Sequence, residues 1–154
     1  MLGILSEQEI EDFLKSQIIG RIGSHYNNIT YITPISYVYN NNIIIAHSAE
    51  GMKIDMMRGN PSVCFEVDKI ENMGNWKSVI TWGTFSEITD ADERKNAVKK
   101  LYMRRFPAVV SEKVKLNKEW PFEPEDTELV SGIIFKIKLY KKTGRFERGD
   151  AITF

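Results

Sequence analysis

The sequence contains a single cysteine, Cys64, among its 154 residues. One cysteine cannot form a disulfide within the chain, which fits a protein of the reducing cytoplasm. Long apolar runs are missing too, because a run such as residues 43–46 is far too short to span a bilayer. The first residues lack the charged and long apolar regions of a secretory signal peptide. We therefore expect a cytoplasmic protein that makes no membrane contact.

An excess of charge of either sign is also missing, since 21 Lys and Arg residues balance 21 Asp and Glu residues. No net field therefore draws the protein to nucleic acid, and we expect no nucleic-acid partner. Hydrophobic residues make up 42% of the chain and charged residues 27%, which is typical of a globular protein and argues against disorder. We expect residues 1–154 to form one domain, which buries roughly 70% of the surface of the unfolded chain.

The signatures of several enzyme classes are absent. The sequence has no Gly-x-Gly-x-x-Gly fingerprint, no P-loop, no paired catalytic carboxylates and no Ser–His–Asp signature. The soft metal ligands His25, His47 and Cys64 do not have the spacing of a zinc site, so no metal is expected. Cys64 lies within a strand pattern, where it is expected to pack as a small apolar group.

What the sequence does contain is a series of strand patterns separated by turns and short helices. A capping box at Ser6 and Glu9 begins a helix at residues 7–16. Further helices are expected at residues 49–58 and, after the cap residue Asp90, at residues 91–106. Strands are expected at residues 21–26, 29–39, 43–48, 62–68, 76–88 and 133–140, with a polar loop at 70–75 and irregular chain at 108–131.

Six strands that mostly follow one another in sequence predict a mainly β fold, an antiparallel barrel with short helices filling the gaps. Turns are expected at residues 27–28 and 40–42, because Asn tolerates left-handed geometry. Pro34 marks an edge position or a bulge, since proline cannot donate to a strand ladder. Gly83 is expected at a bulge in the long strand 76–88.

Residues 34–53 form the most informative segment. Alternation along the strand places Ile45 and His47 on one face and Ala46 and Ser48 on the other. Ser48 lies where a helix N-cap or a phosphate ligand would lie, and the free N–H groups that follow it carry partial positive charge. Gly51 permits close approach of a ligand, and Lys53 adds a full charge. The pattern fits either a structural helix start or an anion site.

Other candidate residues have a structural alternative. A histidine at a strand end, such as His47, is usually structural. Residues 76–79 open a strand in which Ser78, Ile80 and Trp82 share a face, and Trp76 can serve there as an aromatic anchor. The basic cluster of Lys99, Lys100, Arg104 and Arg105 is expected to be a solvated helix face.

Several segments together resemble a known family. They are residues 34–39, 45–53, 60–65, 76–79 with Gly83, 105–107 and 143–145. In order and spacing they are similar to the pyridoxamine 5′-phosphate oxidase-like flavoproteins, and within these to the branch of the nitroimidazole-resistance proteins. The resemblance covers roughly residues 6 to 146, which is most of the chain.

The resemblance implies a six-stranded antiparallel split β-barrel that forms a homodimer with FMN in grooves at the interface. By position, residues 34–37 would contact the edge of the isoalloxazine ring through backbone and side chains: Pro34, Ile35, Ser36 and Tyr37. Ser48 and Lys53, with the amides near Ala49 and Gly51, would bind the phosphate. Further contacts would come from Trp76, Ser78 and Val79, and His47 matches a histidine that lies close to the flavin in this branch.

We therefore expect an FMN-binding homodimeric flavoprotein that reduces a small electron-poor substrate, such as a nitroaromatic, with a reduced nicotinamide. The flavin carries the electron chemistry, so no catalytic residue is assigned. His47 is the candidate for a substrate-side or proton-donating group, because the pKa of histidine lies near neutrality. The extra basic phosphate ligands and the C-terminal substrate motif of the true oxidase are missing, so the resemblance does not imply oxidation of pyridoxamine phosphate.

Two alternatives stay open. One is a non-catalytic module of the same fold that binds or stores flavin or haem, for which only two histidines are available as axial ligands. The other is a deazaflavin cofactor with a polyglutamate tail, which would need a longer basic groove than the balanced charge suggests. Sequence alone decides neither the substrate nor the electron donor.

Overall fold

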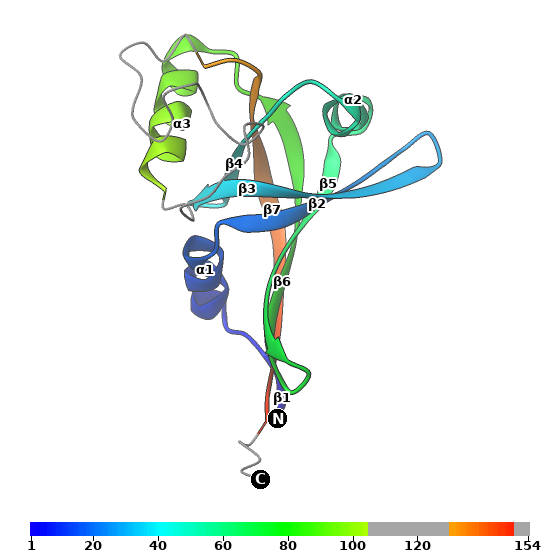
Figure 1. Cartoon of the computed structure of the whole chain (residues 1–154), viewed down its shortest axis with the longest axis vertical. Coiled ribbons are helices and arrows are strands. Elements are labelled where there is room, and N and C mark those ends of the chain that lie inside the picture. Colours follow the sequence, from blue (N-terminus) through cyan, green and yellow to red (C-terminus); the bar gives the residue numbers. More distant parts are fainter. Residues whose placement is uncertain (105–129, 150–154) are drawn as a thin grey trace.

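Six strands close into a ring in the computed structural model, which describes residues 1–104 and 130–149 (Figure 1). All pairings are antiparallel, in the order β1-β7-β4-β3-β2-β5-β6, and β6 also pairs with β7 to complete the ring. The strands are β1 (Leu2–Ile4), β2 (Ile19–Tyr26), β3 (Ile29–Asn40), β4 (Ile43–Ser48), β5 (Ser62–Asn72), β6 (Asn75–Glu87) and β7 (Ile133–Arg148), and the helices are α1 (Glu7–Ser16), α2 (Met52–Gly59) and α3 (Ala91–Met103). The predicted split barrel is confirmed, with β1 as a short addition at the edge of β7.

Two pairs of asparagines make the tight turns of the barrel. Asn27 and Asn28 have φ of 56° and 61°, and Asn41 and Asn42 have φ of 49° and 65°. Two successive residues with positive φ are typical of a type I′ turn, whose twist matches that of the flanking strands. The turns therefore fix the register of β3 against both of its neighbours.

The alternation of β4 divides its side chains between two apolar clusters. Ile44 and Ala46 point into the barrel, where they join a core that contains Tyr37 and Phe65 with ring centroids 4.9 Å apart. Ile45 points to the opposite side and packs in a second cluster with residues of α3 and β7. The predicted parity of this strand is confirmed, so His47 lies on the α3 side and Ser48 on the barrel side.

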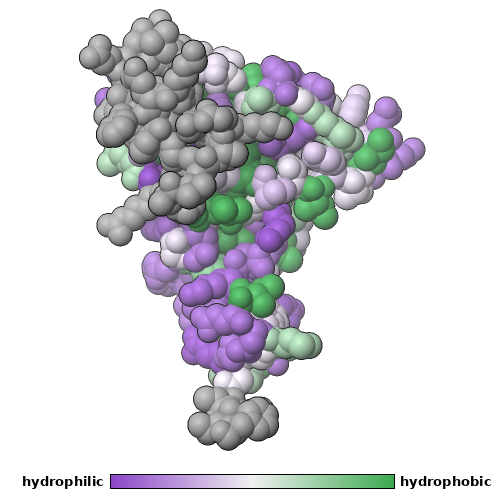
Figure 2. Space-filling view, viewed as in Figure 1, coloured by the Kyte–Doolittle hydropathy of each residue, from purple (hydrophilic) through white to green (hydrophobic). Residues whose placement is uncertain are grey.

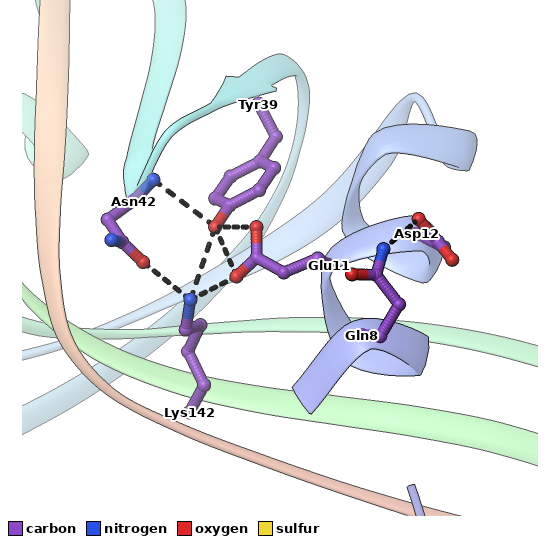
Figure 3. A network of polar contacts seen from close by, with 6 residues as sticks. All are labelled: Gln8, Glu11, Asp12, Tyr39, Asn42 and Lys142. Atoms are coloured by element: carbon purple, nitrogen blue, oxygen red, sulfur yellow. Dashed lines mark hydrogen bonds and ion pairs between the residues drawn. The ribbon is translucent and has the colours of Figure 1, made fainter. Parts of the chain in front are cut away.

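Helix α1 is attached to the barrel by a polar network. Tyr37 donates its hydroxyl hydrogen to the carbonyl oxygen of Leu14 at 2.6 Å. Tyr39 donates to the carboxylate of Glu11, 2.8 Å from Oε2, and Lys142 donates to the same carboxylate and to Asn42 (Figure 3). The network joins α1 to β3 and β7, and β3 is the strand that carries residues 34–37.

Replacing Glu11 by glutamine is expected to lower the free energy of unfolding by about 1–2 kcal/mol at neutral pH, because Lys142 loses its anionic partner. Burial alone would raise the pKa of Glu11, but the hydrogen bonds from Lys142 and Tyr39 outweigh it and lower the pKa below the ordinary 4.5. The stabilisation is therefore present above pH 4.5 and is lost as the pH falls through the lowered pKa. Urea unfolding of the native protein and of Glu11→Gln, above and below pH 4.5, measures the difference in their free energies of unfolding. A difference that does not change with pH would contradict the stabilising role of the Glu11 carboxylate.

Several predicted boundaries are wrong. The loop expected at residues 70–75 is the end of a hairpin, because β5 extends to Asn72 and β6 begins at Asn75. β7 continues to Arg148, well past the expected end at residue 140, since it pairs with β6 from Phe135 to Arg148. α2 begins at Met52, three residues later than expected. The third helix is described only to Met103, so its expected end at 106 and the irregular chain at 108–131 lie almost wholly outside the described residues.

Two predicted irregularities are confirmed. Pro34 pairs with Arg21 of β2, while β4 pairs only with the later part of β3, so Pro34 lies where one edge of β3 is unpaired. The register of β6 against β7 shifts between Trp82 and Gly83, although the extra residue, Tyr140, belongs to β7. No helix within residues 1–104 and 130–149 is long and apolar enough to cross a membrane.

Candidate functional site

The turn between β4 and α2 leaves a helix start open to an external ligand. Gly51 is the N-cap of α2 and supplies no side-chain cap, so the first N–H groups of the helix have no side-chain acceptor. Ser48 is not the N-cap, because its hydroxyl donates to the carbonyl oxygen of Ala49 at 2.9 Å. Space beside Gly51 is empty to at least 4 Å. These are the properties of a helix start that can accept an anion.

The charges around this turn favour an anion. Lys53 is half-buried, and burial lowers its pKa; no acidic group acts on it among the described residues. The acidic side chains nearest in sequence both pair with Arg58: Asp55 at 3.8 Å, and Glu50 with both terminal nitrogens of Arg58 at 2.8 and 2.9 Å. By contrast, the partly buried lysines Lys136 and Lys142 have carboxylate partners in Glu93 and Glu11. A phosphate or carboxylate would give Lys53 the partner that it lacks within the described chain.

Residues 34–37 alternate between the two faces of β3. Pro34 and Ser36 lie on the outer face, whereas Ile35 and Tyr37 are 7% and 1% exposed and belong to the barrel core. The expected side-chain contacts of Ile35 and Tyr37 with a ligand are therefore wrong, since a ligand outside the barrel can reach only their backbone. Tyr37 pairs with Ala46, and in an antiparallel ladder the next pair of positions is 36 and 47. Ser36 and His47 therefore lie opposite each other on the outer face.

His47 is a half-buried hydrogen-bond donor. Its Nε2 lies 2.6 Å from the carbonyl oxygen of Ser131, which can only accept, so we assign the hydrogen to Nε2. Burial lowers the pKa of His47, the hydrogen bond to Ser131 opposes this, and the charges of Arg104, Arg94 and Lys53 lower the pKa further. The ring is therefore uncharged at neutral pH, with Nδ1 left as an acceptor.

An NMR titration of the histidine rings is expected to give His47 a pKa below 6.5. Because the pKa in the folded protein lies below that in the unfolded chain, protonation favours unfolding, and stability falls as the pH drops below 6.5. A His25→Gln variant leaves a single histidine and assigns the signal. A pKa at or above 6.5 would show that burial and the three cations do not lower the pKa of this ring as described.

The second group of expected site residues lies elsewhere on the sheet. Val79 is fully buried in the core, so only its backbone is open to a ligand. Ser78 donates to Glu66 at 3.1 Å, and Trp76 donates its indole N–H to Glu147 at 2.9 Å. Their strand, β6, is separated from β3 by β2 and β5, a distance of about 14 Å at the usual strand spacing. Within one chain the structure does not bring this group together with residues 34–53.

Between the two groups lies an ion cluster that the sequence did not indicate. Arg21 forms ion pairs with Glu66 and Asp68, which lie across the ladder on β5. Alternation along each strand places all three side chains on the outer face. Sequence does not show that they meet, because their contact depends on the register of β2 against β5. Arg104 was also misjudged: it is not on a solvated helix face, and burial lowers its pKa to about 9.

Metal or thiol chemistry finds no support in this part of the molecule. No group of three or more His, Cys, Asp or Glu residues that could hold a metal ion occurs within the described ranges. Cys64 is half-buried, and burial raises the pKa of its thiol, as expected for a packing residue.

A barrel of this topology is found in a known family. The family model described as pyridoxamine 5′-phosphate oxidase matches residues 6–146, and the chain belongs to this family.

Several solved structures and one curated protein are similar to this chain. An FAD-binding protein of Mesorhizobium loti is 25% identical, with a TM-score of 0.69 over 95% of this chain and 98% of that one. The FAD-binding protein of Mycobacterium smegmatis is 26% identical, with a TM-score of 0.65 over 94% and 98%. A Bacteroides thetaiotaomicron protein named for 5-nitroimidazole antibiotic resistance shares the fold, at 19% identity and a TM-score of 0.72 over 95% and 87%. An uncharacterised protein of Rhizobium meliloti is 29% identical over 85 residues, which are 55% of this chain and 56% of the relative's length.

Proposed function

We propose that this protein is a homodimeric flavoprotein that binds FMN and reduces a small electron-poor substrate, such as a nitroaromatic, with a reduced nicotinamide. The observation that carries the proposal is the uncapped start of α2 beside Lys53, a half-buried cation with no acidic partner in the described chain. This helix start follows the end of β4, the strand that carries His47, and His47 shares the outer face with Pro34 and Ser36. An anion and a flat ring can therefore be held side by side.

The phosphate would bind to Lys53, to the amides near Ala49 and Gly51, and to the hydroxyl of Ser48, which would turn from the carbonyl oxygen of Ala49 to donate to it. The ring would lie over Pro34 and Ser36, against the backbone of residues 35 and 37. A bound flavin supplies the electron transfer. The role of His47 would be that of an uncharged ring whose Nδ1 accepts a hydrogen bond, because its other nitrogen is engaged by Ser131. This replaces the proton-donating role expected from sequence.

A homodimer would unite the two separated groups of residues. Trp76, Ser78 and the backbone of Val79 in one copy would face residues 34–53 of the other. The outer sheet face between these groups carries exposed apolar side chains: Ile19, Ile32 and Ile80 are 54%, 67% and 38% exposed. Figure 2 shows several hydrophobic residues among hydrophilic ones on the face of the molecule in view. Register places Ile32 beside Gly23 and Cys64, and Pro34 beside Arg21. Exposed apolar residues gathered on one face are typical of an interface.

The cofactor is proposed to be FMN because one open helix start and one lysine suit one phosphate group. Two of the similar proteins are named as FAD-binding, so analysis of the cofactor released by denaturation must separate FMN from FAD. A deazaflavin with a polyglutamate tail fits less well, since Glu66 and Asp68 neutralise the arginine on this face.

Anaerobic reduction tests the proposed reaction. Addition of a reduced nicotinamide to the flavin-loaded protein is expected to bleach the flavin, and a nitroaromatic acceptor is expected to restore its colour. A flavin that stays oxidised under these conditions would favour the alternative of a non-catalytic flavin-binding module. A Soret band in place of a flavin spectrum would instead indicate haem.

A further inference from the structure

A short segment of chain, residues 130–132, lies against the ring of His47. It leads into β7, the strand that pairs with β4, and Ile134 is the partner of His47 in that ladder. The carbonyl oxygen of Ser131 accepts the Nε2 hydrogen of His47 at 2.6 Å. The ring of His47 is therefore held by a backbone group that comes from the approach to the neighbouring strand.

Gly132 allows the 130–132 segment to come this close to the ring. Its φ is +86°, in the left-handed region that residues with a side chain rarely adopt. A Cβ atom at this position would lie 2.8 Å from the carbonyl oxygen of Ser48 and 2.9 Å from Nε2 of His47. Both the backbone conformation and the available space therefore require glycine, because a side chain here would push the segment away from His47.

Helix α3 fixes the other end of the segment. Arg94 donates from Nη2 to the carbonyl oxygen of Val130 at 2.6 Å. The side chain of Val130 is 2% exposed and belongs to the apolar cluster between α3 and the sheet, where α3 lies beside β4 (Figure 1). The first turn of α3 is itself attached to β7 by the ion pair of Glu93 with Lys136. The carbonyl groups of two successive residues, Val130 and Ser131, thus connect α3 to His47.

This connection decides which nitrogen of His47 is free. A neutral imidazole in water carries its hydrogen on either nitrogen and exchanges it between them, so its acceptor has no fixed position. In this protein Nε2 donates to Ser131, and Nδ1 is left as the acceptor. His47 lies opposite Ser36 on the outer face of the sheet, where the flavin ring is proposed to bind.

We propose that Arg94 and Gly132 are positioning residues, which act through the carbonyl oxygen of Ser131 to present Nδ1 of His47 as an acceptor to an N–H group of the flavin ring. The direction of Nδ1 toward the flavin rests on the proposed function. The hold on His47 does not, because it is made by contacts within the chain.

NMR of the His47 ring tests the hold, in a His25→Gln background that leaves one histidine. We expect one tautomer, with a slowly exchanging hydrogen on Nε2. In Gly132→Ala we expect a mixture of tautomers and a further lowered pKa of His47, because the hydrogen bond to Ser131 raises it. The matched control is Gly74→Ala in the β5–β6 turn, where a Cβ meets nothing closer than 3.7 Å and His47 should be unchanged.

Arg94→Met tests the connection from α3. We expect exchange of the Nε2 hydrogen to become faster by at least about tenfold, because Val130 and Ser131 are no longer held. Lys95→Met is the matched control, since it removes one positive charge from the next position of α3, at an exposed residue. Exchange is the readout for this pair, because loss of the Arg94 charge alone raises the pKa of His47.

Riboflavin tests the direction of Nδ1, because it carries the flavin ring without the phosphate. Gly132→Ala and Arg94→Met are expected to weaken riboflavin and FMN by the same factor, about 2- to 10-fold, the effect of one neutral hydrogen bond. A loss confined to FMN would place the effect at the phosphate and contradict the proposal. Gly74→Ala and Lys95→Met should leave both affinities unchanged.

The proposal would be overturned by unchanged NMR signals of His47 in Arg94→Met, or by altered signals without any loss of riboflavin affinity. Thermal unfolding of each variant shows whether it is folded, and Arg94→Met carries the test if Gly132→Ala does not fold. A protein that takes up no flavin would reject the proposed function, and the direction of Nδ1 with it. The NMR signals of that protein would still decide whether Arg94 and Gly132 hold His47.

Discussion

Replacing Ile32 by lysine is expected to convert the protein from a dimer to a monomer and to release its flavin. Ile32 is 67% exposed in the single chain, so on its own the change should alter the free energy of unfolding by no more than about 0.5 kcal/mol. In a dimer that covers this face, a lysine would be buried without a partner. An unpaired buried charge costs about 3–5 kcal/mol, which corresponds to at least a hundredfold weaker dimer.

Sedimentation at micromolar protein concentration measures the fraction of dimer, and the flavin absorbance of the same sample measures the amount of bound cofactor. The matched control is Met73→Lys at the tip of the β5–β6 hairpin, which makes the same kind of change at a position that is 93% exposed. A dimer that withstands Ile32→Lys would show that the apolar outer face is not the interface. A monomer that keeps full flavin would show that one chain alone forms the site.

Replacing Lys53 by methionine is expected to weaken FMN binding about 10- to 100-fold, because the phosphate loses its one charged partner from this turn. A hydrogen bond to a charged group contributes about 1.5–3 kcal/mol, and each 1.4 kcal/mol corresponds to a factor of ten. Methionine keeps most of the volume of the lysine stem, so the half-buried position stays filled. Fluorescence titration with FMN measures the change.

Riboflavin is the decisive comparison for this variant. It carries the same ring without the phosphate, so its affinity should be the same for the native protein and for Lys53→Met. Lys99→Met, at an exposed position of α3, controls for the loss of one positive charge. Equal losses of FMN and riboflavin affinity would mean that Lys53 supports the shape of the turn and does not contact the phosphate.

The parts of the fold that could be predicted from sequence are those set by local chemistry. The capping box of Ser6 and Glu9 forms as expected, because each partner lies within one turn of helix. The asparagine turns and the parity of β4 are likewise fixed by a few consecutive residues. Charged and polar residues at 141–148 hid the length of β7, which depends on its pairing with β6.

The arrangement of the site depends on contacts between residues far apart in sequence. Tyr37 was expected to face a ligand, but its hydroxyl finds an acceptor at Leu14 inside the barrel. The distance of Trp76 from residues 34–53 follows from the order of four strands, which no local pattern encodes. The same holds for the cations near His47, since Arg94 and Arg104 come from the two ends of α3.

The visible absorption spectrum of the purified protein, before and after addition of FMN, tests the central claim most directly. We predict the spectrum of an oxidised flavin that stays with the protein through gel filtration, in a ratio of one FMN per chain. A protein that is colourless as purified and takes up no added FMN would contradict the account.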